Sequence, residues 1–121
     1  NLDIFRREKT LLHVRKQTKL LTRLLRPMTL LSHVGEIRQC GLMVGIELVQ
    51  DRTTRTPYPL EMRIGHRVAQ ACRKGGLLMR PLGNVIALVP PLSTSPQELT
   101  KMVAILHRAI VDVTEGSASP A

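Results

Sequence analysis

The sequence predicts a small α/β (α+β) domain in which helices pack on one face of a small antiparallel or mixed sheet. Three observations predict this class. Stretches with apolar residues at helical spacing alternate with stretches rich in β-branched residues, glycines and prolines separate them, and 121 residues suffice for one hydrophobic core. The expected order of elements is helix, strand, helix, strand, strand, helix.

The first helix is predicted over residues 8–25, where apolar residues recur at spacings of three, four and seven until a proline ends the pattern. We expect residues 2–5 to form a separate helical turn or short helix. The next element, residues 35–49, is rich in β-branched residues and contains Gly41 and Gly45. Glycines inside a strand indicate a bulge or the close approach of another backbone or a ligand, so one long, bent strand is predicted.

A polar surface loop is predicted over residues 50–59. The helix that follows has apolar residues every four positions, and a Gly-Gly pair at 75–76 ends it. These apolar residues are Leu60, Ile64, Val68 and Cys72. Two strands, residues 77–80 and 85–89, are expected to form a hairpin through the Gly-Asn turn between them.

The last helix has the clearest start signal in the sequence. Ser95 stands at the N-cap, a proline follows at the first helical position, and Glu98 stands at the third, which is the pattern of a capping box. Its apolar face is predicted to comprise Leu99, Met102, Val103, Leu106, Ile110 and Val113. Residues 116–121 have nothing apolar to bury and are predicted to be disordered, so the domain is expected to span residues 1–115.

The composition limits the kinds of function to consider. Eighteen Lys and Arg residues against nine Asp and Glu residues give a formal net charge of +9, which favours a polyanionic partner such as nucleic acid. The moderate basic concentration over residues 6–26 fits a solvated helix face or a phosphate-binding face. One Phe, one Tyr and no Trp leave no platform for base stacking. Without a membrane-length apolar run or a leader, the expected location is cytoplasmic.

Few residues offer catalytic or metal-binding chemistry. Cys40 and Cys72 lie far apart in apolar contexts, so we expect two buried free thiols rather than a disulfide. The four histidines are isolated, which disfavours a metal site, and no phosphate loop or nucleophile elbow is present. Glu36 and Glu47 fit solvent-face or salt-bridging positions of a strand. These residues alone do not indicate an enzyme.

Arg80 stands alone in an apolar run, LLMRPLGNVIALVPPL, just before a proline. The proline favours extended geometry for Arg80, and the turn that follows brings it to one end of the sheet. There its guanidinium group can bind a carboxylate or a phosphate through two parallel hydrogen bonds. The alternative, an arginine at the rim of the hairpin with a solvated head group, stays open on this evidence.

Two stretches of the chain resemble a known family. They are VGEIRQCGLMVGIELVQDRTTRTPYP, residues 34–59, and GGLLMRPLGNVIALVPPLSTSPQEL, residues 75–99. Both resemble the C-terminal small domain of the class III aminotransferases, which use pyridoxal phosphate, and the likeness extends over nearly the whole chain. The run LLMRPLGNVI ahead of PPL is most similar to the branch of the family that acts in biotin synthesis.

The resemblance implies a substrate-binding role for Arg80. In the ornithine and acetylornithine branch, the arginine that binds the substrate carboxylate occupies the position of Ala87 in this sequence. In the biotin-pathway branch, an arginine ahead of Pro-Leu/Phe-Gly holds the far carboxylate of 8-amino-7-oxononanoate, and Arg80 matches that arginine. The resemblance thus implies a guanidinium group at the mouth of an apolar channel.

The resemblance also implies what lies outside the chain. The family's Schiff-base lysine and its other contacts to pyridoxal phosphate belong to a large domain, and none of the five lysines here matches that lysine; they are Lys9, Lys16, Lys19, Lys74 and Lys101. We therefore expect a fragment with no catalytic, cofactor-binding or metal-binding residues of its own, inactive without its large domain. The complete enzyme would be a homodimer that moves an amino group from S-adenosylmethionine to 8-amino-7-oxononanoate. Another class III ω-aminotransferase and a basic nucleic-acid-binding module are the alternatives.

Overall fold

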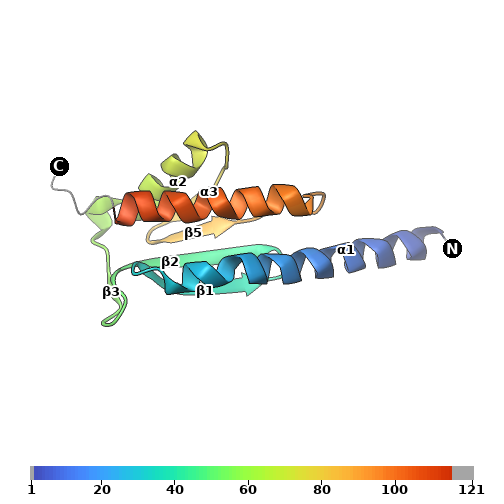
Figure 1. Ribbon diagram of the computed structural model, residues 1–121, viewed down its shortest axis with the longest axis horizontal. Helices are drawn as coiled ribbons and strands as arrows, with labels where there is room; N and C mark the ends of the chain where they lie inside the picture. Colours follow the sequence, from blue (N-terminus) through green and yellow to red (C-terminus); the bar gives the residue numbers. More distant parts are fainter. Residues whose placement is uncertain (1, 116–121) are drawn as a thin grey trace.

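The computed structural model describes the backbone of residues 2–115 and the side chains of residues 6–115. In this range three α-helices, α1 (Leu2–Leu25), α2 (Ile64–Lys74) and α3 (Pro96–Thr114), accompany one antiparallel sheet. Helices α1 and α3 run side by side along the long axis of the molecule (Figure 1). The predicted fold class is confirmed.

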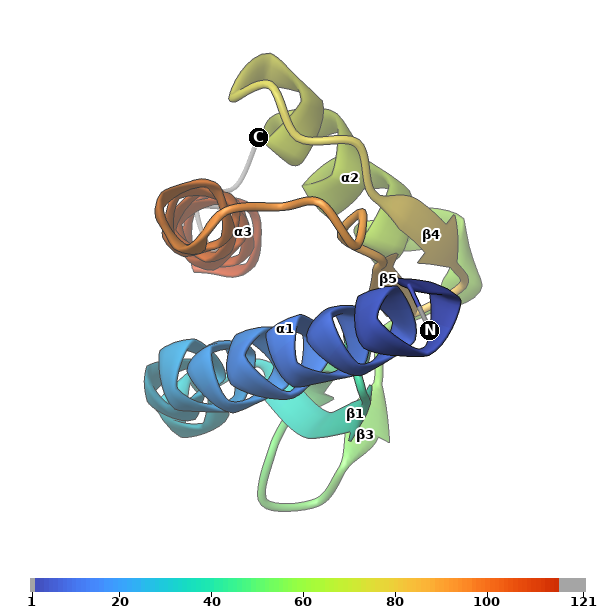
Figure 2. The ribbon, with the colours of Figure 1, turned by 90° about the vertical axis from the view of Figure 1, so that its right-hand side faces the viewer.

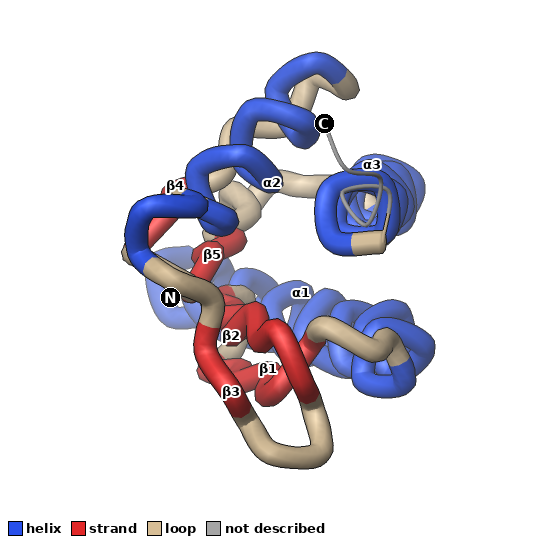
Figure 3. Tube along the Cα trace, turned by 90° about the vertical axis from the view of Figure 1, so that its left-hand side faces the viewer, coloured by secondary structure: helices blue, strands red, loops and turns tan. Residues whose placement is uncertain are grey.

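The sheet has the strand order β1-β2-β5-β4, and every neighbouring pair is antiparallel. A short strand, β3 (Thr56–Pro57), pairs with the end of β2. The other strands are β1 (Val34–Cys40), β2 (Met43–Asp51), β4 (Arg80–Leu82) and β5 (Val85–Leu88). The strands lie along one side of the molecule and α3 lies on the other (Figures 2 and 3).

The hydrophobic core lies between the sheet and the helices. Alternate residues of the two central strands are buried, so one face of the sheet faces the core. These strand residues and their main partners on the helices are Val44, Ile46, Leu48, Ile86, Leu88, Leu21, Val68, Leu99 and Leu106. Burying each such side chain contributes roughly 1.5–3 kcal/mol, so aliphatic packing holds the fold together.

The first helix is longer than predicted. It begins at Leu2, so the separate turn predicted over residues 2–5 is wrong. The physical reason is local, because residues 6–9 are Arg-Arg-Glu-Lys, all good helix formers, and nothing between the two predicted pieces breaks the helix. A 3-10 helix with Pro27 in its first turn follows the C-terminal end of α1.

The long, bent strand predicted over residues 35–49 is instead a hairpin of β1 and β2. Cys40 pairs with Met43, and Gly41 and Leu42 form the two-residue turn between them. Gly41 has a φ of +59°, a conformation that glycine adopts without steric cost and that tight hairpin turns require. Gly45 lies inside β2, opposite Arg38.

The segment between β2 and α2 differs in part from its prediction. Tyr58, expected in a surface loop, is only 5% exposed and belongs to the core. Leu60, expected on α2, is 77% exposed and lies in a separate 3-10 helix (Leu60–Met62), because Arg63 takes a left-handed conformation that separates the two helices. Helix α2 ends at Lys74 and Gly75 caps it, as predicted.

The C-terminal half otherwise follows the prediction. The hairpin of β4 and β5 turns at Gly83 and Asn84, although β4 begins at Arg80 rather than at Leu77. Helix α3 has the predicted capping box, in which Ser95 accepts a hydrogen bond from the Glu98 amide and the Glu98 carboxylate accepts one from the Ser95 amide. The predicted disordered tail, residues 116–121, lies outside the described residues.

Candidate functional site

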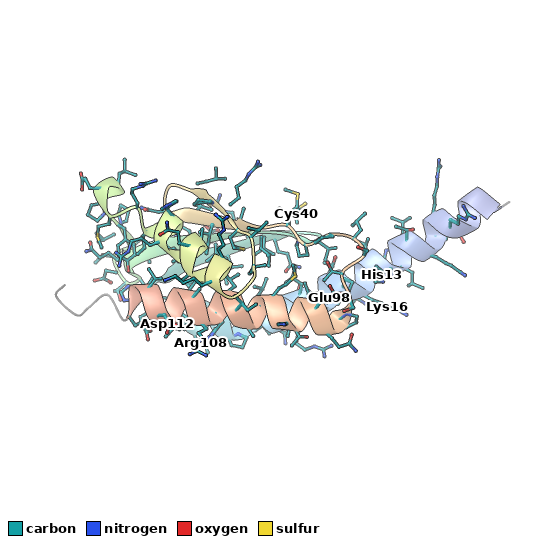
Figure 4. The ribbon with its side chains drawn as sticks, turned by 90° about the horizontal axis from the view of Figure 1, so that it is seen from above. His13, Lys16, Cys40, Glu98, Arg108 and Asp112 are labelled. Carbon is teal, nitrogen blue, oxygen red and sulfur yellow. The ribbon has the colours of Figure 1, made fainter. Side chains whose placement is uncertain are left out.

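The side of the sheet that faces away from the helices is uncovered within residues 6–115, and we call it the open face. Because side chains alternate along a strand, it carries the residues that do not point into the core. Figure 4 shows one of them, Cys40, on the side of the sheet away from α3. The open-face residues are Glu36, Arg38, Cys40, Met43, Gly45, Glu47, Arg80, Leu82, Val85 and Ala87.

Two rows of directly opposed residues cross the open face from β1 to β4. The first row consists of Arg38, Gly45, Ala87 and Arg80. The second row consists of Glu36, Glu47, Val85 and Leu82. Directly opposed residues of antiparallel strands present their side chains on the same side, so each row is a line of neighbouring side chains.

Arg80 lies in the edge strand β4, opposite Ala87. It is exposed, whereas the next residue, Pro81, is half-buried, which places Arg80 on the open face. Within the described part of the chain its guanidinium group has no hydrogen-bond or ion-pair partner. Arg80 therefore keeps all five donor N–H groups for a ligand or for another polypeptide.

Arg38, at the other end of the same row, is paired with Glu36. Its Nη2 donates a hydrogen bond of 3.0 Å to Oε2 of Glu36. This hydrogen bond and the guanidinium charge lower the pKa of the Glu36 carboxyl group and raise the pKa of Arg38. Both side chains are well exposed, so the pair orients Arg38 more than it stabilises the fold.

A depression of about 320 Å³ lies in the open face between these two arginines. It is mainly apolar, and Gly45 and Ala87 are among its lining residues. Arg38 and Leu82 also line it, whereas Arg80 lies one strand beyond Ala87 and is not part of its lining. The geometry thus combines a shallow apolar surface with an unpaired cation at its side.

Every lysine of the chain is exposed on a helix, whereas a Schiff-base lysine is activated by desolvation. Figure 4 shows Lys16 on the part of α1 that extends away from the body of the molecule. Among the described residues no group of three or more His, Cys, Asp or Glu side chains could hold a metal ion.

The other titratable residues are partly as predicted. Both cysteines are free, and Cys72 is buried, but Cys40 is exposed because its side chain points to the open face, so the prediction of two buried thiols is wrong for Cys40. His13 is exposed, and the other three histidines are partly buried. The alignment of Gly45 with Ala87 and Arg80 was not predicted, because it depends on the register between β2 and β5, two strands that are far apart in the sequence.

Comparison with known proteins assigns the chain to a family. The family model for class III aminotransferases matches residues 1–110. The adenosylmethionine-8-amino-7-oxononanoate aminotransferase of Nitratidesulfovibrio vulgaris is 50% identical over 118 residues, which are 98% of this chain and 22% of that protein. The enzyme of the same name from Methanocaldococcus jannaschii is 44% identical over 90% of this chain and 24% of its own length.

Solved structures agree with this assignment. The crystal structure of the Methanocaldococcus jannaschii enzyme has a TM-score of 0.86 and 43% identity, over 93% of this chain and 26% of that one. An omega transaminase from Pseudomonas jessenii, in complex with PMP, has a TM-score of 0.86 and 33% identity, over 100% of this chain and 27% of that one. The chain spans about a quarter of the length of these relatives.

None of its described helices has the length and apolar character that a membrane span requires.

Proposed function

The chain belongs to the class III aminotransferases, and from this premise we propose that residues 1–115 form the C-terminal small domain of the aminotransferase of biotin synthesis. The complete homodimeric enzyme would transfer an amino group from S-adenosylmethionine to 8-amino-7-oxononanoate. Identities of 40–50% with several proteins of that name support the choice of branch. The chain's length, about a quarter of theirs, supports its being one domain of a larger enzyme.

The cofactor belongs, in this proposal, to the part of the enzyme outside these residues. A transaminase structure from Vibrio fluvialis, 27% identical with a TM-score of 0.85, is described as PLP-bound, and pyridoxal phosphate supplies the amino-transfer chemistry when bound. The exposure of every lysine of the present chain supports this proposal. We therefore infer that this domain binds and orients the substrate, and that it has no transaminase activity without the cofactor-binding domain.

Arg80 is the residue that we propose binds the substrate carboxylate. The observation that carries this role is its unpaired, exposed guanidinium group on the open face, next to a mainly apolar depression. A planar guanidinium group binds a carboxylate through two parallel hydrogen bonds. The adjacent apolar surface suits a chain-like acid.

The first prediction tests Arg80 in the complete aminotransferase that contains this segment. We expect Arg80→Ala to slow the 8-amino-7-oxononanoate half-reaction on the order of 10- to 100-fold, because hydrogen bonds to the carboxylate are lost. The S-adenosylmethionine half-reaction should change much less, and stopped-flow absorbance measures each half separately. Arg108→Ala, on the exposed outer face of α3 (Figure 4), is the control. Equal losses in both half-reactions would contradict the assigned role.

A second candidate is another class III ω-aminotransferase, in which Arg80 binds a different acid. The likeness to the omega transaminase of Pseudomonas jessenii over the whole chain favours it. A screen of amino donors separates the two candidates, because only the biotin-pathway enzyme is expected to accept S-adenosylmethionine. Turnover with a simple amine donor, and none with S-adenosylmethionine, would support the second candidate.

A further inference from the structure

A trough crosses the open face along the row of Arg38, Gly45, Ala87 and Arg80. Its floor is made by Gly45 and Ala87, which have no side chain beyond a methyl group. Larger residues before and after them form its walls. These are Met43, Glu47 and Val85 of the open face, and Val89 just beyond β5. The mainly apolar depression of about 320 Å³ occupies the middle of this trough.

Packing within the chain does not require glycine at position 45. A Cβ atom added there would meet only Cγ1 of Val85, at an ordinary contact distance of 3.8 Å, and its φ is not in the left-handed region. Gly35 and Gly65 differ in this respect. A Cβ atom added to Gly35 would lie 2.7 Å from the Val49 side chain, and one added to Gly65 would lie 2.3 Å from the Gly83 oxygen. A glycine in a strand weakens it unless something approaches closely, so the constraint on Gly45 lies outside the described residues.

The two ends of the trough differ in charge. Arg38 is neutralised by its ion pair with Glu36, whereas Arg80 is unpaired within the described residues. An anionic group entering the trough is therefore attracted to the Arg80 end. A bound acid would therefore place its carboxylate at Arg80 and extend the rest of its chain over Ala87 and Gly45.

The chemistry of the trough favours an alkyl chain over a peptide segment. The floor is formed by β2 and β5, which pair with each other and with β1 and β4 on both sides, so their backbone groups are used in the ladder. A peptide lying across such a surface would bury its own N–H and C=O groups without partners, which is costly. An alkyl chain has no such groups, and it gains free energy from contact with Met43, Val85 and Val89.

We propose that the trough binds the aliphatic chain of the carboxylate substrate, with Gly45 and Ala87 as specificity-determining residues. The proposal rests on the proposed function of Arg80 and adds the path of the substrate chain. Two strand spacings separate Arg80 from Gly45, about 10 Å, a span suited to a medium-length acid rather than to a short one.

Competitive inhibition of the complete enzyme by two unreactive acids, nonanoate and propionate, tests the trough. We expect Ala87→Leu, which fills the floor, to raise the inhibition constant of nonanoate by about tenfold or more and to leave that of propionate nearly unchanged. Gly45→Ala should act in the same direction with a smaller effect. Ala104→Leu, a matched change at an exposed position of α3, should change neither constant.

The outcomes separate this proposal from the function of Arg80. If Arg80→Ala raises the inhibition constants of both acids while Ala87→Leu and Gly45→Ala leave that of nonanoate unchanged, the trough proposal is overturned and the role of Arg80 stands. If Arg80→Ala raises neither inhibition constant, both proposals are overturned. The proposal is also wrong if Ala87→Leu raises both inhibition constants equally, or if it lowers the melting temperature of the enzyme more than Ala104→Leu does. Either result would indicate that a polypeptide segment covers the trough.

Discussion

At the scale of single residues, the thiol of Cys72 lies fully buried on the core side of α2. This burial raises its pKa from an ordinary value of 9.0 to about 11, because the thiolate would lose its hydration in the core. Burial likewise raises the pKa of the Tyr58 hydroxyl group. Both groups therefore remain neutral in the folded chain at pH values where they begin to ionise in the unfolded chain.

The stability of the chain is expected to fall as the pH rises from about 9 to 11. In this range the unfolded state releases the Cys72 proton and the folded state retains it, so each pH unit removes up to about 1.4 kcal/mol from the free energy of unfolding. Urea denaturation at a series of pH values measures the slope. Cys72→Ala should be less stable at neutral pH and should lose less stability over this window. An equal slope in both proteins would contradict the assignment to Cys72.

Sequence alone located some single residues and misplaced others. Arg80 was expected at one end of the sheet, and it does lie in a strand next to a hairpin turn, because a proline and a Gly-Asn turn fix the local backbone. Cys40 was expected to be buried because its neighbours are apolar. A strand residue faces the core or the solvent according to register, which local hydrophobicity does not determine.

At the scale of elements, α2 and the β4–β5 turn approach each other closely at Gly65. Gly65 is buried near the start of α2, and an added Cβ would lie 2.3 Å from the Gly83 oxygen. That oxygen belongs to the backbone, so it cannot move aside as the end of a flexible side chain would. The turn that follows Arg80 is thus held against α2 by a contact that only glycine allows.

Gly65→Ala is therefore expected to destabilise the chain by about 1–3 kcal/mol, the usual cost of forcing extra volume into a packed site. The better helix propensity of alanine offsets only part of this cost. Gly45→Ala is the matched control, because its Cβ would make an ordinary contact at 3.8 Å and should leave stability unchanged or slightly higher. Urea denaturation of both variants gives the comparison. A Gly65→Ala chain as stable as the control would show that α2 can move away from the turn.

The helices were easier to predict than the first hairpin. Helix α3 has a capping box and a regular apolar face, so local signals determine both its start and its buried side. The β1–β2 hairpin turns at Gly41 and Leu42 inside an almost continuous apolar run, which hides the turn. A glycine as the first of two turn residues, between two alternating stretches, was the signal available.

A contact between elements was also missing from the sequence-based prediction. Gln17 of α1 is buried, and its side-chain amide donates a hydrogen bond to the backbone oxygen of Thr94, just before α3. This bond joins two segments 77 residues apart in the chain. A buried polar partner at such a distance leaves no local pattern, because its neighbours on α1 follow the ordinary amphipathic spacing.

At the scale of the whole molecule, α1 extends beyond the rest of the fold (Figure 1). From residue 6 to residue 16 all side chains are exposed except Val14, which is partly buried. Leu11 and Leu12, which are consecutive in the sequence, are 57% and 53% exposed, so no described residue covers this part of the helix. From Gln17 onward the same helix packs against α3 and the core.

The exposed half of α1 is therefore expected to open far more readily than the packed half. A helix of this length without tertiary contacts is marginally stable in water, so its amides should exchange with solvent close to the rate of an unfolded peptide. Hydrogen exchange measured by mass spectrometry on the 121-residue chain should show fast exchange over residues 6–16 and protection over residues 18–25. In the complete aminotransferase both halves should be protected, because the exposed leucines then have a partner surface. Equal protection along α1 in the free chain would contradict this expectation.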